Sequence, residues 1–328
     1  MTVNDKRSFT ISVVMPLYNG AHDVLRAVHS VFQQQVADLE LIVVNDGSTD
    51  GGEKIVRDLN DERIQIIDQN NKGVSAARNR GVAEAKGDLI AFLDADDEWK
   101  PDFLETIMRL YGNFTTCSVY ATHYFYKEID GTLRLPILRR VPPGIWEGIL
   151  ENYFETAAHS DPPLWSSAIA VKKSALLSAG GFPEGVSIGE DLLTWARLAM
   201  KCEIAYSKKQ CAVFWLRAPL TGYPTRTPEI PDVVGERLRE LLAQVHADKK
   251  KDFLQYLSMW HRMRASMFVQ LEDRTNAMVE IRKMAHYSMT DPRVIVYFAA
   301  AATPRLLRKF VLRFFTFIRM LYRTIRRR

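Results

Sequence analysis

The sequence predicts an α/β protein with a mainly parallel sheet covered by helices, followed by a C-terminal helical extension. Across the first hundred residues, short β-branched runs alternate with helical patterns, which is typical of strand–helix–strand units in a parallel sheet. From about residue 228 onward, β-branched runs and glycines become scarce and helical patterns dominate. Ligands of such sheets bind beyond the carboxyl ends of the strands, so we expect the chemistry at the strand-to-helix junctions.

The first elements follow from the spacing of apolar residues. Four apolar runs predict buried strands at Ile11–Met15, Leu41–Val44, Ile64–Ile67 and Leu89–Leu93. Helical spacing predicts helices between them at 24–32, about 51–60 and 74–86. These elements would form one βαβαβαβ sheet.

The pattern is looser after Trp99. We expect a helix at about 101–111, strands near 118–126 and at Ala168–Val171, a short helix ending at Ala179, and a helix from Glu190 to about Lys201. The change to helical patterns predicts a domain boundary near 225. The predicted parts are a sheet domain (1–225), a helical extension (226–302) and a terminal basic segment (303–328).

Composition excludes several classes of protein. The chain has 328 residues, 47% of them apolar and 25% charged, which excludes wholesale disorder, collagen and a disulfide scaffold. The three cysteines lack metal-type spacing and favour a reducing compartment. The N-terminus lacks the apolar core of a secretory signal, and the longest uncharged stretch near the end has 11 residues, too few to span a bilayer. We therefore expect a cytoplasmic protein.

The motif Asp94-Ala95-Asp96 follows the fourth predicted strand. Alternate residues just past a strand end can direct two carboxylates at one small volume, where Mg²⁺ would bind them together with substrate phosphates. The alternative is a solvated acidic turn that caps the next helix. Spacing alone does not separate the two interpretations.

Two other acidic positions have similar alternatives. Asp46, in VVNDGSTD, belongs to a turn signal, but it places a second acidic residue at another strand's carboxyl end. Glu190 and Asp191 open a predicted helix, where acidic residues favour the helix dipole; the functional alternative is a general base.

These motifs together resemble family-2 glycosyltransferases with the GT-A fold. VVMPLYNG, LIVVNDGSTDGG, NKGVSAARNRG, GDLIAFLDADDEW and GGFPEGVSIGEDLLTWARLA occur in the family's order over about residues 9–220. The resemblance implies inverting transfer from a nucleotide-diphosphate sugar, usually a UDP-sugar, assisted by Mn²⁺ or Mg²⁺. It also implies an acceptor hydroxyl on a glycan or a lipid-linked molecule, in the synthesis of surface polysaccharides or glycoconjugates.

The resemblance also implies roles for individual residues. The implied donor-binding residues are Pro16, Leu17, Tyr18, Asp46, Arg78, Asp94, Ala95, Asp96 and Arg217. Asp46 would bind the uracil edge, Asp94 would face the ribose, and Asp96, with Asp94, would hold the metal. Asp191 matches the family's catalytic base, although Glu190 could be the base or orient the acceptor. His159 and Trp165 fall in the stretch expected to contact the acceptor, or belong to a loop and the core.

Differences from the family pattern restrict which reactions we expect this protein to catalyse. The Q-x-x-R-W signature and membrane spans of processive polymerases are missing, so we expect addition of one sugar. A non-catalytic, sugar-nucleotide-binding scaffold remains an alternative. A sugar-1-phosphate nucleotidyltransferase would need a Gly-rich basic loop after the first strand, and MPLYNGAHD supplies none.

The end of the chain is strongly basic. Residues 292–328 contain ten basic and no acidic residues, whereas the first 291 residues carry a net charge of −5. At 100° per residue, the cations of 305–328 gather on one side of a helix and the apolar residues on the other. We expect this helix to bind an anionic membrane surface on the inner face of the cell membrane. Packing on the protein or on a second subunit is the alternative, and nucleic acid is not an expected partner.

Overall fold

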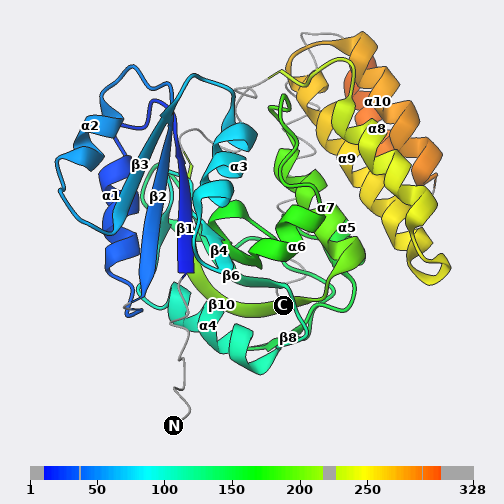
Figure 1. The fold of residues 1–328 in the computed structure, drawn as a ribbon. Helices are drawn as coiled ribbons and strands as arrows, with labels where there is room; N and C mark the ends of the chain where they lie inside the picture. Colours follow the sequence, from blue (N-terminus) through cyan, green and yellow to red (C-terminus); the bar gives the residue numbers. More distant parts are fainter. Residues whose placement is uncertain (1–10, 37, 217–226, 290, 304–328) are drawn as a thin grey trace. The chain divides into compact units, whose positions relative to one another are not determined.

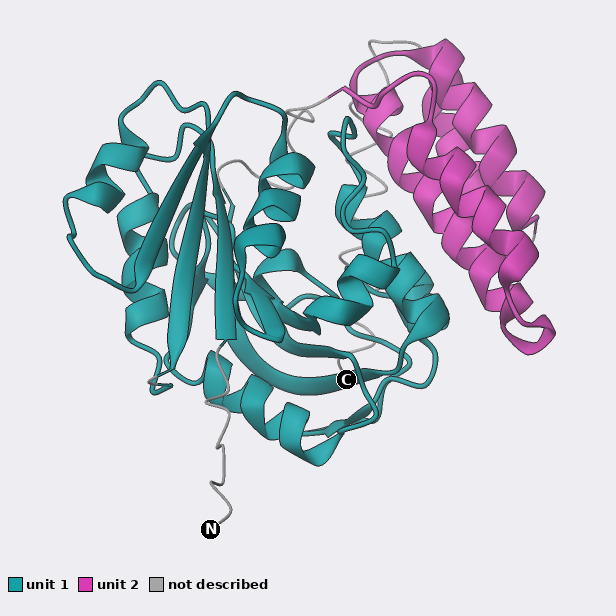
Figure 2. Cartoon of the chain, in the orientation of Figure 1, with its two compact units in different colours: residues 1–220 teal, residues 221–328 magenta. Residues whose placement is uncertain are grey.

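The computed structural model describes residues 11–36, 38–216, 227–289 and 291–303. The chain divides into two compact units, residues 1–220 and residues 221–328 (Figure 2). Among the described helices, none combines the length and the apolar character that crossing a bilayer requires.

Unit 1 is built on one mixed sheet (Figure 1). Its central path has the order β3-β2-β1-β4-β9-β6-β10-β5, with β7 paired to β6 and β8 paired to β10. The strands are β1 (Ile11–Leu17), β2 (Leu39–Asp46), β3 (Ile64–Gln69), β4 (Leu89–Phe92), β5 (Glu98–Trp99), β6 (Val119–Lys127), β7 (Leu133–Arg134), β8 (Glu147–Ile149), β9 (Ile169–Lys172) and β10 (Ile204–Trp215).

Strand direction decides where the functional groups gather. The first four strands are parallel to one another, whereas β9 runs antiparallel to both of its neighbours, β4 and β6. Strand β6 therefore runs in the same direction as β4, and β10 is parallel to β6. The carboxyl ends of six strands consequently lie along the same edge of the sheet.

Helices cover the sheet. Those of unit 1 are α1 (Val24–Phe32), α2 (Gly52–Arg57), α3 (Val74–Glu84), α4 (Phe103–Asn113), α5 (Tyr153–His159), α6 (Lys173–Ser178) and α7 (Glu190–Lys201). Most of the apolar stripe of α1 is buried, as its helical spacing predicts: Val24, Val28 and Val31 are inaccessible, whereas Leu25 is 39% exposed. Helix α3 passes very close to β1, because a Cβ atom at Gly81 would lie 2.4 Å from Cγ1 of Val14. Glycine is therefore required there.

Every strand predicted in the sequence is present, with shifted ends. The strand prediction at Leu41–Val44 ended too early, because the strand continues to Asp46 and is buried along most of its length. The twelve-residue strand β10 was not predicted. It contains the polar segment Lys208–Gln210, where its register against β6 shifts, so its sequence lacks the regular alternation of a strand.

Unit 2 is helical in its described part, as predicted. It contains α8 (Val233–Leu241), α9 (Lys250–Gln270), α10 (Arg274–Tyr287) and α11 (Arg293–Ala302), with 3₁₀ turns at Leu242–Gln244 and Ala247–Lys249. Its apolar core includes Phe268 and Ile281, on α9 and α10. The proposed tail, 305–328, lies outside the described residues, and the division of the chain at 225 and 303 stays a prediction.

Candidate active site

Arg78 is the centre of a cluster of charged side chains drawn from three separate segments. It lies on α3, and its Nη2 donates to both carboxylate oxygens of Asp94, at 2.7 and 3.0 Å. Its Nη1 donates to Oε1 of Glu190, at the start of α7, over 3.2 Å. The guanidinium is buried, with 3% of the side chain exposed. The two acidic motifs that follow β4 and open α7 therefore meet through one arginine.

The backbone around Phe182 connects α3 to the segment before α7. Asn79 donates to the carbonyl of Phe182 and accepts from its N–H, both over 2.9 Å. Gly181 must be glycine for this contact, because its φ is +63° and a Cβ atom would lie 2.7 Å from Oδ1 of Asn79. The Phe182 ring lies 5.1 Å from the guanidinium of Arg78. These contacts hold α7 in place beside the arginine.

The electrostatics of the cluster affect Arg78 and Asp191 differently. Burial alone lowers the pKa of Arg78, but the nearby carboxylates of Asp94 and Glu190 outweigh it, so the pKa is raised and the guanidinium stays charged. Burial and the negative charge of Glu190 raise the pKa of Asp191 to about 7, against the lowering effects of Arg78 and of the Leu192 N–H. The side chain of Asp191 is partly exposed. With this pKa, its carboxylate changes charge near neutral pH.

The residues from Asp94 to Trp99 alternate in burial. Asp94 and Asp96 are partly exposed, whereas Ala95 and Asp97 are buried. Asp97 accepts from Oγ of Ser167 over 2.5 Å, and Ser167 in turn accepts the N–H of Asp94 over 3.1 Å. Burial, with the charges of Asp96 and Asp94, raises the pKa of Asp97 well above its usual range. Asp97 and Ser167 therefore fix the loop from inside and leave Asp94 and Asp96 on its accessible side.

Arg26 holds the same loop from α1. Its Nη2 donates to the backbone carbonyl of Asp96 over 2.6 Å, and its Nη1 donates to Asp23 over 2.8 Å. The guanidinium also lies 3.9 Å from the centre of the Trp215 ring, at the end of β10. The roles of Arg26, Asp97 and Ser167 were not predicted, because they depend on contacts between segments far apart in the chain.

Asp46 is buried at the end of β2 and anchors the start of α3. Its Oδ1 accepts from Nε2 of Gln69 and from the N–H of Lys72, at 2.7 and 2.9 Å, and its Oδ2 accepts from the N–H of Gly73 at 2.8 Å. Gly73 caps the helix that carries Arg78. Asp46 is therefore coupled to the cluster through the position of α3.

Two of the predicted donor-binding residues have their side chains in the core. Leu17 is fully buried, and Ala95 is 8% exposed within the same apolar cluster. The motif resemblance alone does not show which side chains of a motif are buried and which face solvent. Tyr18 is 56% exposed and Pro16 partly exposed. Arg217 lies outside the described residues.

The donor set at the end of β4 fits a hard divalent cation. Asp94 and Asp96 are partly exposed carboxylates two residues apart, and carboxylate oxygens are the ligands that Mg²⁺ and Mn²⁺ prefer. Both oxygens of Asp94 already accept bonds from Arg78. Asp94 and Asp96 are therefore the candidate ligands of such a cation.

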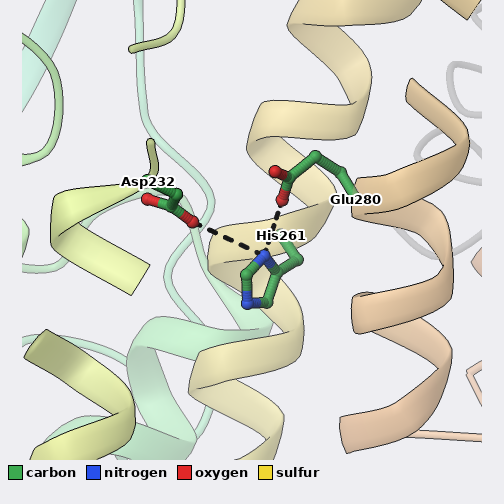
Figure 3. A group of neighbouring side chains, drawn as sticks. All are labelled: Asp232, His261 and Glu280. Carbon is green, nitrogen blue, oxygen red and sulfur yellow. Dashed lines mark hydrogen bonds and ion pairs between the residues drawn. The ribbon is translucent and has the colours of Figure 1, made fainter. Parts of the chain in front are cut away.

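A second metal-type group, in unit 2, consists of Asp232, His261 and Glu280 (Figure 3). Nδ1 of His261 lies 2.6 Å from Oε2 of Glu280 and 3.8 Å from Oδ2 of Asp232. Nε of Arg264 lies 3.3 Å from Asp232 and 3.2 Å from Glu280. Because a guanidinium already neutralises both carboxylates, this group is a buried ion-pair network rather than a metal centre. No motif spacing in the sequence pointed to it.

His159 and Trp165, the two candidates for the acceptor side, have structural partners. His159 ends α5, and its Nδ1 lies 2.8 Å from the carbonyl of Glu155. The indole N–H of Trp165 donates to Asp97 over 3.1 Å, and its ring lies 4.4 Å from that of Phe214. Trp165 thus supports the acidic loop and packs against the core.

Comparisons with known proteins agree with this architecture. Residues 12–174 match the family model "Glycosyl transferase family 2". The chain is 31% identical over 256 residues to glycosyltransferase GlyA of Streptococcus pneumoniae, covering 76% of this chain and 35% of that protein. It is 38% identical over 125 residues to TuaG of Bacillus subtilis, a putative teichuronic acid biosynthesis glycosyltransferase, covering 37% of this chain and 49% of that one. The chain spans about a third of the length of several curated relatives that it matches.

Solved structures share the fold. The crystal structure of residues 1–349 of S. aureus TarS in complex with UDP-GlcNAc superimposes with a TM-score of 0.65 at 19% sequence identity, covering 92% of this chain and 86% of that chain. The prediction of a GT-A fold with C-terminal helices is thereby confirmed. Together with the ordered motifs and the carboxylate–arginine cluster, the matches establish that this chain belongs to glycosyltransferase family 2.

Proposed function

We propose that the protein transfers one sugar from a nucleotide-diphosphate sugar to an acceptor hydroxyl, with inversion at the anomeric carbon. Family membership supports sugar transfer, and the TarS complex with UDP-GlcNAc supports a UDP-sugar as the donor class. The acceptor is a glycan or a lipid-linked molecule of surface polysaccharide synthesis, a class in keeping with the name of TuaG. The protein would act on the cytoplasmic face of the membrane.

The observation that carries this proposal is the position of Asp191, which directly follows Glu190 at the start of α7, the helix end that Arg78 joins to the acidic loop after β4. A pKa of about 7 makes this carboxylate a far better proton acceptor than an ordinary aspartate while leaving much of it ionised at neutral pH. It would remove the proton of the acceptor hydroxyl as that oxygen attacks the anomeric carbon. A single displacement from the face opposite the leaving group inverts the configuration, and it needs no covalent enzyme intermediate.

Asp191 is a better candidate for the base than its neighbour Glu190. Glu190 is 9% exposed, and its Oε1 already accepts a hydrogen bond from the buried guanidinium of Arg78. Asp191 is more accessible and accepts the N–H of Leu192 over 2.7 Å. Glu190 would therefore act on Asp191 through its charge rather than take the proton itself.

Asp96, assisted by Asp94, would hold Mn²⁺ or Mg²⁺, which when bound supplies positive charge to the diphosphate leaving group. Arg26 and Asp97 would keep the loop in position for that ion. Arg78 makes three hydrogen bonds to Asp94 and Glu190, which support a positioning role for it. These bonds join the loop that would hold the cation to the start of the helix that carries the base. Direct contact between Arg78 and the nucleotide remains a prediction.

Other residues at the same edge of the sheet would contact the nucleotide. Asp46 would accept from the base of the nucleotide while its loop fixes α3, and Tyr18 and Pro16 would contact the base and ribose. The basic segment 305–328 would attach the protein to an anionic membrane, which suits a lipid-linked acceptor. A homo-oligomer is compatible with these roles.

A donor panel tests this function. The full chain is incubated with Mn²⁺ and sugars carried on UDP, GDP, CDP or dTDP, with and without lipid extract, and release of the nucleoside diphosphate is measured. We expect release from a UDP-sugar, stimulated by the extract and abolished in Asp96→Asn. Binding of UDP without release from any donor would indicate a non-catalytic scaffold and contradict the proposal.

A further inference from the structure

Helix α11 carries apolar side chains on two opposite faces. One face closes the core of unit 2 through Ala300 and Ala301, each 1% exposed, against residues of α9 and α10. On the other face, Ile295 is 74% exposed and Phe298 is 51% exposed. Large apolar side chains at such exposure, grouped on one short helix, are typical of a surface that has a partner.

The exposed residues form a stripe. Phe298 and Ala302 follow Ile295 by three and seven positions, so at 100° per residue all three lie within about 60° of one another. Met289, in the turn before the helix, is 86% exposed. Between Val294 and Thr303 the helix has no charged residue, so the stripe presents apolar surface without flanking charges of its own.

Charge decides which partner fits this surface. The acidic residue nearest to the helix in sequence, Asp291, is paired with Arg293 over 2.7 Å and with Arg262 over 3.8 Å. Nine basic and no acidic residues follow in 305–328, where cations and apolar residues separate at helical spacing. An apolar stripe that is followed in the sequence by a cationic, apolar segment complements the acyl chains and anionic head groups of a bilayer.

We propose that the outer face of α11, formed by Ile295, Phe298 and Ala302, inserts into the surface of an anionic membrane. The membrane-binding region would then begin at α11 instead of at residue 305. This inference rests on the membrane partner in the proposed function and extends it to a named, folded surface. Because the opposite face of α11 closes the core of unit 2, the helix would couple the bilayer directly to that unit.

Vesicle flotation of the full chain tests the inference. Vesicles of phosphatidylcholine alone are compared with vesicles that also contain roughly 30 mol% of the anionic lipid phosphatidylglycerol. We expect binding only to the anionic vesicles. Ile295→Ser with Phe298→Ser should weaken it by about tenfold or more, because each side chain loses much of its transfer free energy. The control, Leu25→Ser with Leu177→Ser, removes two exposed apolar side chains of unit 1 and should bind like the wild type.

The outcomes separate this inference from the proposed function. Donor hydrolysis and the unfolding temperature should be unchanged in the Ile295/Phe298 variant, because neither side chain is buried. If that variant binds as tightly as the wild type while Arg323→Gln with Arg326→Gln and Arg327→Gln loses binding, the role of α11 is overturned and the membrane partner stands. If the wild type does not float with anionic vesicles, the membrane partner itself is wrong. Loss of a dimer in the Ile295/Phe298 variant without loss of flotation would identify a subunit interface and overturn the inference.

Discussion

Replacing Arg78 by methionine should unfold unit 1 at a much lower temperature. The substitution keeps a long side chain but removes three hydrogen bonds, of 2.7, 3.0 and 3.2 Å, that neutralise Asp94 and Glu190. Removing one partner of a buried ion pair costs about 3–5 kcal/mol. Both carboxylates keep some exposure, 22% and 12% of their side chains, so we expect the lower end, about 3 kcal/mol.

For a unit of this size, that loss corresponds to a decrease in Tm of roughly 6–12 °C. Scanning calorimetry of the full chain measures it, with the transitions of the two units compared. Arg80→Met is the matched control, because Arg80 lies on the same helix and pairs with Glu84 at the surface. Such a pair contributes at most about 1 kcal/mol. Equal transition temperatures for the Arg78 and Arg80 variants would refute the view that Arg78 holds the site together.

The same contacts determine the expected effects of three other substitutions. Glu190→Gln removes the negative charge that raises the pKa of Asp191, so the acidic limb of kcat/KM should move to lower pH; an unmoved limb would exclude this coupling. Arg26→Ala frees the backbone of Asp96, so the Mn²⁺ concentration for half-maximal transfer should increase roughly tenfold, and an unchanged requirement would contradict the positioning role. In unit 2, Arg264→Met should cost about 3 kcal/mol or more of stability, while a chelator leaves the unfolding of the wild type unchanged; a chelator effect on that transition would instead indicate a metal centre.

The sheet could be predicted where strands are apolar throughout. Strands buried on both faces appear in the sequence as continuous runs, as in Leu41–Val44 and Leu89–Leu93. Strand β10 escaped prediction because Lys208 and Lys209 interrupt its apolar residues where the register shifts. Helix α5 was also not predicted.

The candidate site was predictable where an acidic residue follows a strand or opens a helix. Asp94 and Glu190 are 96 positions apart in the sequence, and only the fold shows that one buried arginine joins them. The supporting residues carry no local signal. Arg26 and Ser167 are ordinary helix and turn residues until their contacts to the Asp94–Asp97 loop are known.

The network in unit 2 was missed for a related reason. Asp232 caps α8, while His261 and Glu280 lie on α9 and α10, so their spacing matches no motif. None of the predicted site residues lies in that region. The structure assigns the cluster to the stability of the helical unit, which is a different role from the chemistry at the edge of the sheet.

If Asp191 takes the proton of the acceptor hydroxyl, its replacement by asparagine should stop the chemical step without affecting the donor. Sugar transfer by Asp191→Asn is measured across pH, together with its affinity for UDP. Transfer should fall by about 10²–10⁴-fold while UDP binding is unchanged. In the wild type, transfer should decrease as pH falls through about 7, because the carboxylate is then protonated. Undiminished turnover in Asp191→Asn would contradict the claim and move the base to another residue.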